Sequence, residues 1–459
     1  MPRNPVAPLM SACVILAVSL VAAINLAIPK LAASSLDPSR TQLVWIVDAY
    51  VIVFACLLIP AGALGDRLGR KGVLLAGLGI FAAGAVLAAL APAAGVLIAA
   101  RAVMGAGAAL VMPATLSLML QSAPAERRGH AIGVWTAATG IAGAVGNLAG
   151  GAVLQYLPWQ GLFWSAAPAA LLLLALTARY APRGERHPAA ADLPGTALLV
   201  LGFVALLYGI IEGPERGWSA GAVLVAFGAA AVILGGFVAR SLRAAQPLVD
   251  PRLFAVARLR AGALGVTVLF VGLFALFYVN AQYLQYAKGY SPLVAGIAIG
   301  PLAVGMLAFS RRAIPLSGRV GARPVTAAGF GLLVGGLALM SLTGADTPYL
   351  LYGLVLLGLA AGMGLAMPVL SQQIIAALPP HRAGLGSGLN SAVREVGSAL
   401  GVAVMATVLA GHFGGAEPRG AAAVAAFTDG MAAGYRTVAI AVAAFAVLIV
   451  VWLREPATP

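Results

Sequence analysis

Four ionisable side chains lie well inside long apolar runs of this sequence: Asp48, Arg101, Arg394 and Glu395. A charged group in hydrocarbon needs a partner or a water-filled cavity, because its desolvation is costly. A carboxylate that is partly removed from water can also take up and release a proton near neutral pH. These four side chains are therefore the first candidates for proton coupling and substrate binding.

Asp48 lies about two helical turns into its apolar run, close to the aromatic residues Trp45 and Tyr50. Its carboxylate could bind a lipophilic cation, and either ring could add a cation–π attraction. The alternative is an interfacial Asp48 that caps the start of the helix, with both rings in the aromatic belt of the membrane surface. We favour the cavity role, because Asp48 lies too deep for a helix N-cap.

Arg394 and Glu395 lie near the middle of another apolar run. Residues at helical spacing around Glu395 form one small, polar stripe: Gly384, Gly388, Ser391, Glu395 and Ser398. The stripe could face a cavity, or it could pack closely on a neighbouring helix. Arg101 also has two interpretations: a functional arginine, or an interfacial one whose long side chain reaches the membrane surface.

The decapeptide Gly62-Ala63-Leu64-Gly65-Asp66-Arg67-Leu68-Gly69-Arg70-Lys71 joins two apolar runs. We expect Asp66 to contact backbone amides at the start of the helix near Arg382, because a helix N-terminus attracts a carboxylate. This contact would form a latch between the two halves of the molecule. Its residues are Gly62, Asp66, Arg67, Gly69, Arg70 and Lys71. The alternative is an ordinary basic turn between two membrane helices.

The elements that must position these residues are membrane-spanning helices. Hydrophobic residues make up 61% of the 459 residues and charged residues only 9%, whereas a soluble domain has about 25% charged residues. A spanning helix needs about 20 apolar residues. The apolar runs predict an all-α polytopic membrane protein with 14 spans, at 9–29, 43–64, 73–91, 95–121, 131–154, 161–178, 193–211, 219–239, 261–286, 292–310, 324–343, 349–376, 384–410 and 434–453.

The basic residues predict the orientation. An even number of spans places both termini on one side, and most Lys and Arg residues fall on that side. The opposite side holds only Lys30, Arg40, Arg216, Lys288, Arg419 and Arg436. Cytoplasmic loops carry the excess of Lys and Arg, so we expect cytoplasmic termini. The net charge of +14 then reflects orientation in a lipid bilayer, and we expect no nucleic-acid partner. Cys13 and Cys56 form no metal or redox pattern.

The sequence repeats itself at an offset of 255 residues. The paired positions are Gly107 and Gly362, Met112-Pro113 and Met367-Pro368, Pro124 and Pro379, Arg127 and Arg382, Gly129 and Gly384, Gly133 and Gly388, and Gly146 and Gly401. The decapeptide recurs with a three-residue slip at 316–323. Two related halves of six spans each predict bundles at 1–180 and 251–459. The linker at 181–250 then contains two additional spans.

These motifs together resemble the fourteen-span drug:proton antiporter branch of the major facilitator superfamily. The matching segments are Asn25 to Pro29, Trp45 to Tyr50, the decapeptide, Arg101 with Gly105 and Gly107, the glycines Gly133, Gly146, Gly150 and Gly151, and Tyr283 to Pro292. The resemblance implies the major facilitator fold and export of small amphipathic molecules, cationic ones among them, by alternating access. It also implies proton-gradient energy without a cofactor, and a multi-pass location in a bacterial inner membrane. We further expect a functional monomer.

The resemblance assigns residues to functions. It implies a cavity lined by Asp48, Arg101, Arg394, Glu395, Trp45, Tyr50, Asn25, Asn280 and Gln282. The four glycines named above would form the antiporter motif. Several positions depart from the pattern: Leu20 replaces the first-span acid, Ala142 a glycine, Asn147 a proline, Gln160 an arginine, Gly161 a tryptophan, and Gly318 the aspartate of the second decapeptide.

Other functions remain open at this point. The same architecture could be a solute:proton symporter or an exporter of one dedicated metabolite or antibiotic. An enzyme is disfavoured because the sequence lacks Gly-x-Ser-x-Gly, His-Glu-x-x-His and a Cys/His cluster, and its histidines fall in or beside loops, at His130, His187, His381 and His412. The repeat and the latch favour alternating access over a channel.

Overall fold

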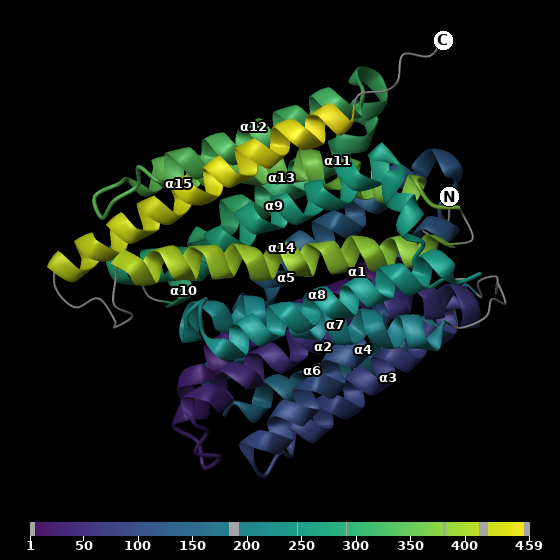
Figure 1. The fold of residues 1–459 in the computed structure, drawn as a ribbon. Coiled ribbons are helices and arrows are strands. Elements are labelled where there is room, and N and C mark those ends of the chain that lie inside the picture. Colours follow the sequence, from purple (N-terminus) through teal and green to yellow (C-terminus); the bar gives the residue numbers. More distant parts are fainter. Residues whose placement is uncertain are drawn as a thin grey trace. The chain divides into compact units, whose positions relative to one another are not determined.

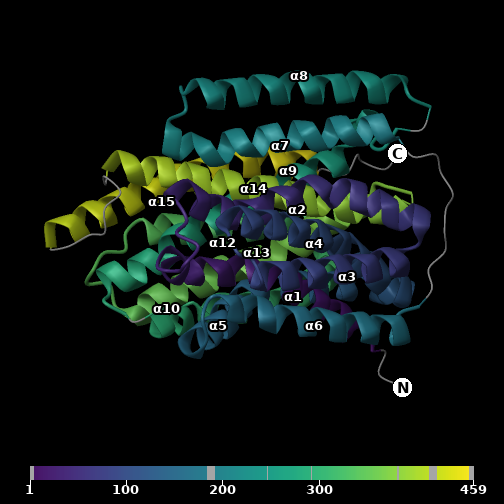
Figure 2. The same cartoon turned by 90° about the horizontal axis from the view of Figure 1, so that it is seen from below.

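The computed structural model describes residues 5–182, 192–245, 247–290, 292–379, 382–412 and 421–453, and these residues form an all-helical fold (Figures 1 and 2). Within these ranges, 14 helices are long and apolar enough to cross a membrane, as the sequence predicts. Arg419, His187, Ser291 and His381 lie outside the described residues.

The helices follow one another through the chain with short connections. They are α1 (Val6–Ala32), α2 (Arg40–Leu68), α3 (Arg70–Ala89), α4 (Ala94–Ser122), α5 (Arg128–Tyr156), α6 (Gln160–Tyr180), α7 (Leu193–Arg216), α8 (Gly221–Arg243), α9 (Ala257–Gln282), α10 (Pro292–Ala298), α11 (Gly300–Val320), α12 (Ala322–Met340), α13 (Tyr349–Ala376), α14 (Ala383–His412) and α15 (Ala421–Trp452). A π-helical turn at Tyr283–Ala287 follows α9.

The helices gather into two compact units. Unit 1 comprises described residues within 1–204, 232–251 and 378–392, and unit 2 comprises those within 205–231, 252–377 and 393–459. In unit 1, α3 lies beside α4 and α6, and in unit 2, α12 lies beside α13 and α15 (Figures 1 and 2). Three helices, α7, α8 and α14, contribute residues to both units. The domain boundaries at residues 180 and 250 stay a prediction.

The repeat is visible in how the helices pack. A Cβ atom on Gly77 of α3 would lie 2.8 Å from the carbonyl oxygen of Gly107 on α4. The corresponding pair in unit 2, Gly329 on α12 and Gly362 on α13, has the same 2.8 Å approach. Glycines at these crossings let two helix backbones come close together. The two units therefore share a helix-packing pattern, and not only a sequence pattern.

The decapeptide is mostly helical, although the expected spans end at residue 64 and begin again at residue 73. Helix α2 continues to Leu68 and α3 begins at Arg70, so one residue, Gly69, separates them. Gly69 has φ +100°, a conformation that side chains with a Cβ atom rarely adopt. A glycine in this conformation lets α3 begin one residue after the charged last turn of α2 ends.

Two further helices extend beyond their expected ends. The tenth span continues to Val320 instead of residue 310, so Arg311 and Arg312 lie within α11. The last helix begins at Ala421 instead of residue 434, so Arg436 lies well inside α15 and not near its start. Hydropathy marks the apolar part of a helix, and it does not report how far the helix continues beyond that part.

Candidate functional site

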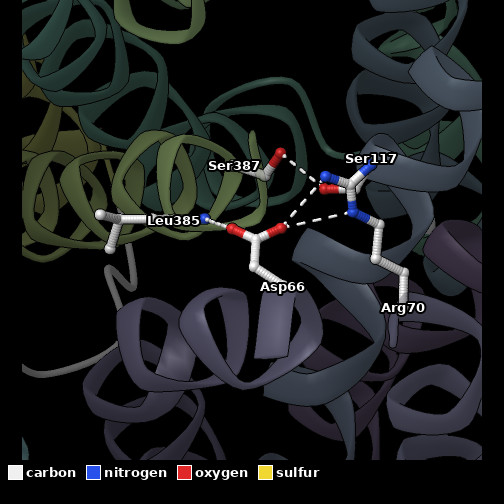
Figure 3. A network of polar contacts seen from close by, with 5 residues as sticks. All are labelled: Asp66, Arg70, Ser117, Leu385 and Ser387. Carbon is white, nitrogen blue, oxygen red and sulfur yellow. Dashed lines mark hydrogen bonds and ion pairs between the residues drawn. The ribbon is translucent and has the colours of Figure 1, made fainter. Parts of the chain in front are cut away.

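The carboxylate of Asp66 joins the end of α2 to the start of α14 inside unit 1 (Figure 3). Its Oδ2 accepts a hydrogen bond of 3.0 Å from the backbone amide of Leu385. Its Oδ1 accepts bonds from Arg70, at 3.1 Å from Nη2 and 3.3 Å from Nε. The first backbone amides of a helix have no partner within that helix. The expected contact between Asp66 and the start of this helix is therefore confirmed, and Asp66 is only 8% exposed.

Close packing surrounds this contact. The hydroxyls of Ser117 on α4 and Ser387 on α14 lie 3.3 Å apart (Figure 3). A side chain at Gly388 would collide with the carbonyl oxygen of Leu58 on α2. The first turns of α14 are thus held by a charged hydrogen bond, a hydroxyl pair and a backbone-to-backbone approach.

The basic residues of the decapeptide have different partners. The Lys71 ammonium donates to the carbonyl oxygens of Ala178 and Ala181, both at 2.8 Å. These carbonyls end α6, where a positive charge is favourable. Arg67 is exposed. The decapeptide therefore contacts α14 through Asp66 and α6 through Lys71. Its glycines Gly62 and Gly69 are buried.

A second polar cluster forms where α1, α2 and α4 meet in unit 1. Arg101 is fully buried, and its Nε donates to the carbonyl oxygen of Ile46 at 3.0 Å. Its guanidinium carbon lies 4.4 Å from the centre of the Tyr50 ring. The Tyr50 hydroxyl donates in turn to the carbonyl oxygen of Ala17 at 2.6 Å. A side chain at Gly105 would collide with the Tyr50 backbone, so the glycine sets the approach of α4 to α2.

Asp48 lies on the same helix between Ile46 and Tyr50. It is half-buried and interacts electrostatically with Arg101. The N-cap of α2 is Ser39, which forms a capping box with Gln42, so Asp48 does not cap this helix. Trp45 is also half-buried. Sequence patterns alone did not reveal that Arg101 and Tyr50 are in contact.

Unit 2 holds its own buried arginine. The guanidinium carbon of Arg394 on α14 lies 4.7 Å from the centre of the Phe270 ring on α9. Glu395 follows it and interacts with it electrostatically. Side chains at Gly397 and Gly401 would collide with carbonyl oxygens of α9, those of Thr267 and Val271. This part of α14 is therefore pressed against α9.

The remaining expected site residues are spread over both units. Asn25 is exposed and bonds to its own helix, through Val21 at 3.0 Å. Gln282 likewise bonds to the carbonyl of Tyr278 at 2.8 Å, while Asn280 is 1% exposed. The antiporter glycines Gly146 and Gly150 pack against α1, at Ser19 and Ala23, with Gly133 buried and Gly151 near Leu26.

A buried carboxylate in a spanning helix was missed. Glu212 is 6% exposed and forms an ion pair with Arg216. The expected span ended at residue 211, but α7 continues through Pro214 to Arg216. Just beyond it, Trp218 donates a hydrogen bond of 3.0 Å to Thr407 on α14. The sequence-based number of four ionisable side chains inside the spans was therefore too low.

Within the part of the chain that the structure describes, no cluster of His, Cys, Asp or Glu could hold a metal.

Comparisons with known proteins agree with this architecture. The family profile of the Major Facilitator Superfamily matches residues 10–402. The chain is 33% identical to the methylenomycin A resistance protein of Streptomyces coelicolor over 385 residues, covering 82% of this chain and 79% of the relative. It is 35% identical to the puromycin resistance protein pur8 of Streptomyces alboniger over 442 residues, covering 93% and 85%.

Among solved structures, the human organic anion transporter MFSD10 (TETRAN) shares the fold with a TM-score of 0.66. The likeness covers 99% of this chain and 100% of that one at 18% identity, which supports the fold alone. The family profile and the two bacterial relatives each extend over most of the chain. The chain therefore belongs to the Major Facilitator Superfamily.

Proposed function

We propose that this protein exports small amphipathic molecules, of the kind that act as antibiotics, in exchange for protons. The observation that carries the proposal is the identity of 33% and 35% to two antibiotic resistance proteins over most of the chain. A transport site for such molecules is apolar with a few polar anchors, and the cluster of Asp48, Tyr50 and Arg101 supplies such anchors.

The latch residues support alternating access. Asp66 holds the first turns of α14 through an amide that has no partner within its helix. Such a bond can be released and remade without unfolding either helix. The transport cycle then opens and closes one side of the protein as Asp66 leaves and regains the Leu385 amide.

The proton enters through carboxylates in the membrane. Asp48 and Glu395 each interact electrostatically with a buried arginine, Arg101 and Arg394. An arginine neighbour favours the charged form of a carboxylate, so a change in their distance changes proton affinity. The energy comes from the proton gradient, with no cofactor.

The protein acts in the inner membrane of a bacterium, as a monomer with both termini in the cytoplasm. The excess of Lys and Arg on the terminal side supports this orientation.

The experiment is a flux assay in reconstituted vesicles with an imposed pH gradient. Ethidium movement across the vesicle membrane should drive proton movement in the direction opposite to that of ethidium. A pH-sensitive dye records the proton movement. Asp48→Asn should abolish this exchange, whereas Asp37→Asn, which removes a charge from an exposed position between α1 and α2, should retain it. Proton movement in the same direction as ethidium would indicate symport and contradict the proposal.

A further inference from the structure

The terminal nitrogens of Arg101 stand out in the buried polar cluster of unit 1. The side chain is completely buried. Its Nε bonds to Ile46 and its flat face lies over Tyr50. Its Nη1 and Nη2 are buried without a hydrogen-bond partner among the described residues. These two atoms carry four N–H donors, and buried charged donors strongly favour an acceptor.

The surrounding side chains do not supply that acceptor. The Tyr50 ring attracts the guanidinium through its face, which leaves the in-plane N–H groups unused. The Tyr50 hydroxyl is engaged with the carbonyl of Ala17. Leu20, one turn further along the buried face of α1, is apolar and 7% exposed. Asp48 interacts electrostatically with Arg101, but it makes no hydrogen bond to Nη1 or Nη2. The buried guanidinium therefore keeps two terminal nitrogens without an acceptor in the described part of the chain.

Packing alone does not require an arginine here. The repeat relates Arg101 to Leu356 on α13 and Tyr50 to Leu302 on α11, which are also buried. The α11–α13 contact in unit 2 thus forms with two leucines where the α2–α4 contact has a cation and a phenol. An arginine retained at the first position serves a purpose other than joining the helices.

We propose that Arg101 binds a carboxylate of the transported molecule through Nη1 and Nη2. A guanidinium matches a carboxylate with two parallel hydrogen bonds. The substrate class is then amphipathic carboxylic acids, including zwitterions whose amine lies near half-buried Asp48. This inference deepens the proposed export function, on which it rests, by naming the charge that the substrate carries.

The test uses two fluorescent probes that differ in one group: dansyl-phenylalanine and its uncharged primary amide. Binding to the purified full-length protein is followed by the dansyl emission. The acid should bind at least about tenfold more tightly than the amide, since charge-assisted bonds are roughly twice as strong as neutral ones. Arg101→Gln should remove this preference. Equal binding of the two probes to the wild type, or no binding of either, overturns the inference.

A second pair of variants keeps Arg101 in place. Leu20→Asp would place a carboxylate on α1 one turn from Ala17, whose carbonyl oxygen accepts the Tyr50 hydroxyl, and should remove the preference for the acid. Leu20→Asn adds a polar group of the same size without charge, and its acid-to-amide ratio should match the wild type. A Leu20→Asp protein that still prefers the acid as strongly as the wild type contradicts the proposal.

Ethidium exchange in the same preparation separates the two proposals. Exchange of ethidium for protons, combined with equal binding of acid and amide, leaves the export function standing and removes this inference. An Arg101-dependent preference for the acid, without exchange of ethidium for protons, supports this inference and contradicts the proposed exchange function.

Discussion

The two copies of the decapeptide differ in chemistry while their backbones agree. Gly69 and Gly321 end α2 and α11 with φ +100° and +91°. Each donates its amide four residues back, to Gly65 at 3.1 Å and to Ser317 at 2.9 Å. The first copy carries Asp66, which holds α14, whereas Gly318 takes that place in the second. The turn therefore requires its glycine but does not require the aspartate. Asp66 can accordingly form its hydrogen bond with α14 without a role in the turn itself.

The same division holds inside the two units. Glycines of both copies make matching helix crossings, such as Gly146 against α1 and Gly401 against α9. The buried arginines, by contrast, occupy different helices, Arg101 in α4 and Arg394 in α14. Duplicated small residues build the framework, whereas the buried arginines lie at positions that the repeat does not relate, with Leu356 opposite Arg101 and Thr139 opposite Arg394. Exchanging residues between the copies tests this view.

The largest effect should come from making unit 1 resemble unit 2. Arg101→Leu copies Leu356 and should lower transport at least about 100-fold, because it removes a buried cation from the polar cluster. The reverse exchange, Leu356→Arg, should leave the protein less stable by about 3 kcal/mol or more, since it buries a charge without a partner. Flux assays and thermal unfolding measure the two outcomes. Near-normal transport by Arg101→Leu would show that the cluster is structural.

Asp66→Ala tests the latch. Turnover should fall about tenfold while the dissociation constant of the substrate changes less than about threefold, because the lost bond stabilises a conformation and not the bound substrate. Flux and equilibrium binding on the same preparation give the two numbers. The matched change Gly318→Asp should leave both nearly unaltered. An equal loss of turnover and binding in Asp66→Ala would argue against a latch.

The glycine crossings should respond alike in both units. Gly146→Ala and Gly401→Ala each force a methyl group against a carbonyl oxygen of a neighbouring helix. Each should cost about 1–3 kcal/mol of stability, read as a lower temperature of thermal unfolding. Gly143→Ala, on the same helix with open space around it, is the control. A large effect in one unit only would break the equivalence of the two frameworks.

The smallest effect concerns Asp192, which precedes α7 and has no counterpart in the repeat. Burial raises the pKa of Asp192, but hydrogen bonds from the Arg240 side chain and from the amides of Gly195 and Leu248 outweigh it, so the pKa is lowered overall. A lowered pKa in the folded state stabilises the protein above the ordinary pKa of the carboxyl, and this contribution is lost as the pH falls through the folded value.

Asp192→Asn should accordingly lower the unfolding temperature slightly at pH 7. The difference from the wild type should shrink as the pH falls below about 4. Thermal unfolding at a series of pH values measures both. A difference that does not depend on pH would mean that the charge of Asp192 is not what matters.

Much of the fold could be predicted from the sequence because hydropathy and span length follow directly from the bilayer. The 14 spans and the contact of Asp66 with the start of a helix needed only general physics. Glu212 was missed because Pro214 suggests a helix end, although α7 continues past it. The stacking of Arg101 on Tyr50 depends on how α2 and α4, which are separated in the sequence, cross each other. A local sequence pattern carries no information about that crossing.

The one-residue turn at Gly69 has a mechanical consequence. Asp66 grips α14 just before the turn, and Lys71 grips the end of α6 just after it. With a single residue between α2 and α3, the connection cannot lengthen when α2 is displaced. Any motion that pulls Asp66 from the Leu385 amide is passed directly to α6. The turn therefore couples the Asp66–Leu385 contact to the contacts of Lys71 with α6. Inserting residues into the turn should let the first contact break without displacing the second.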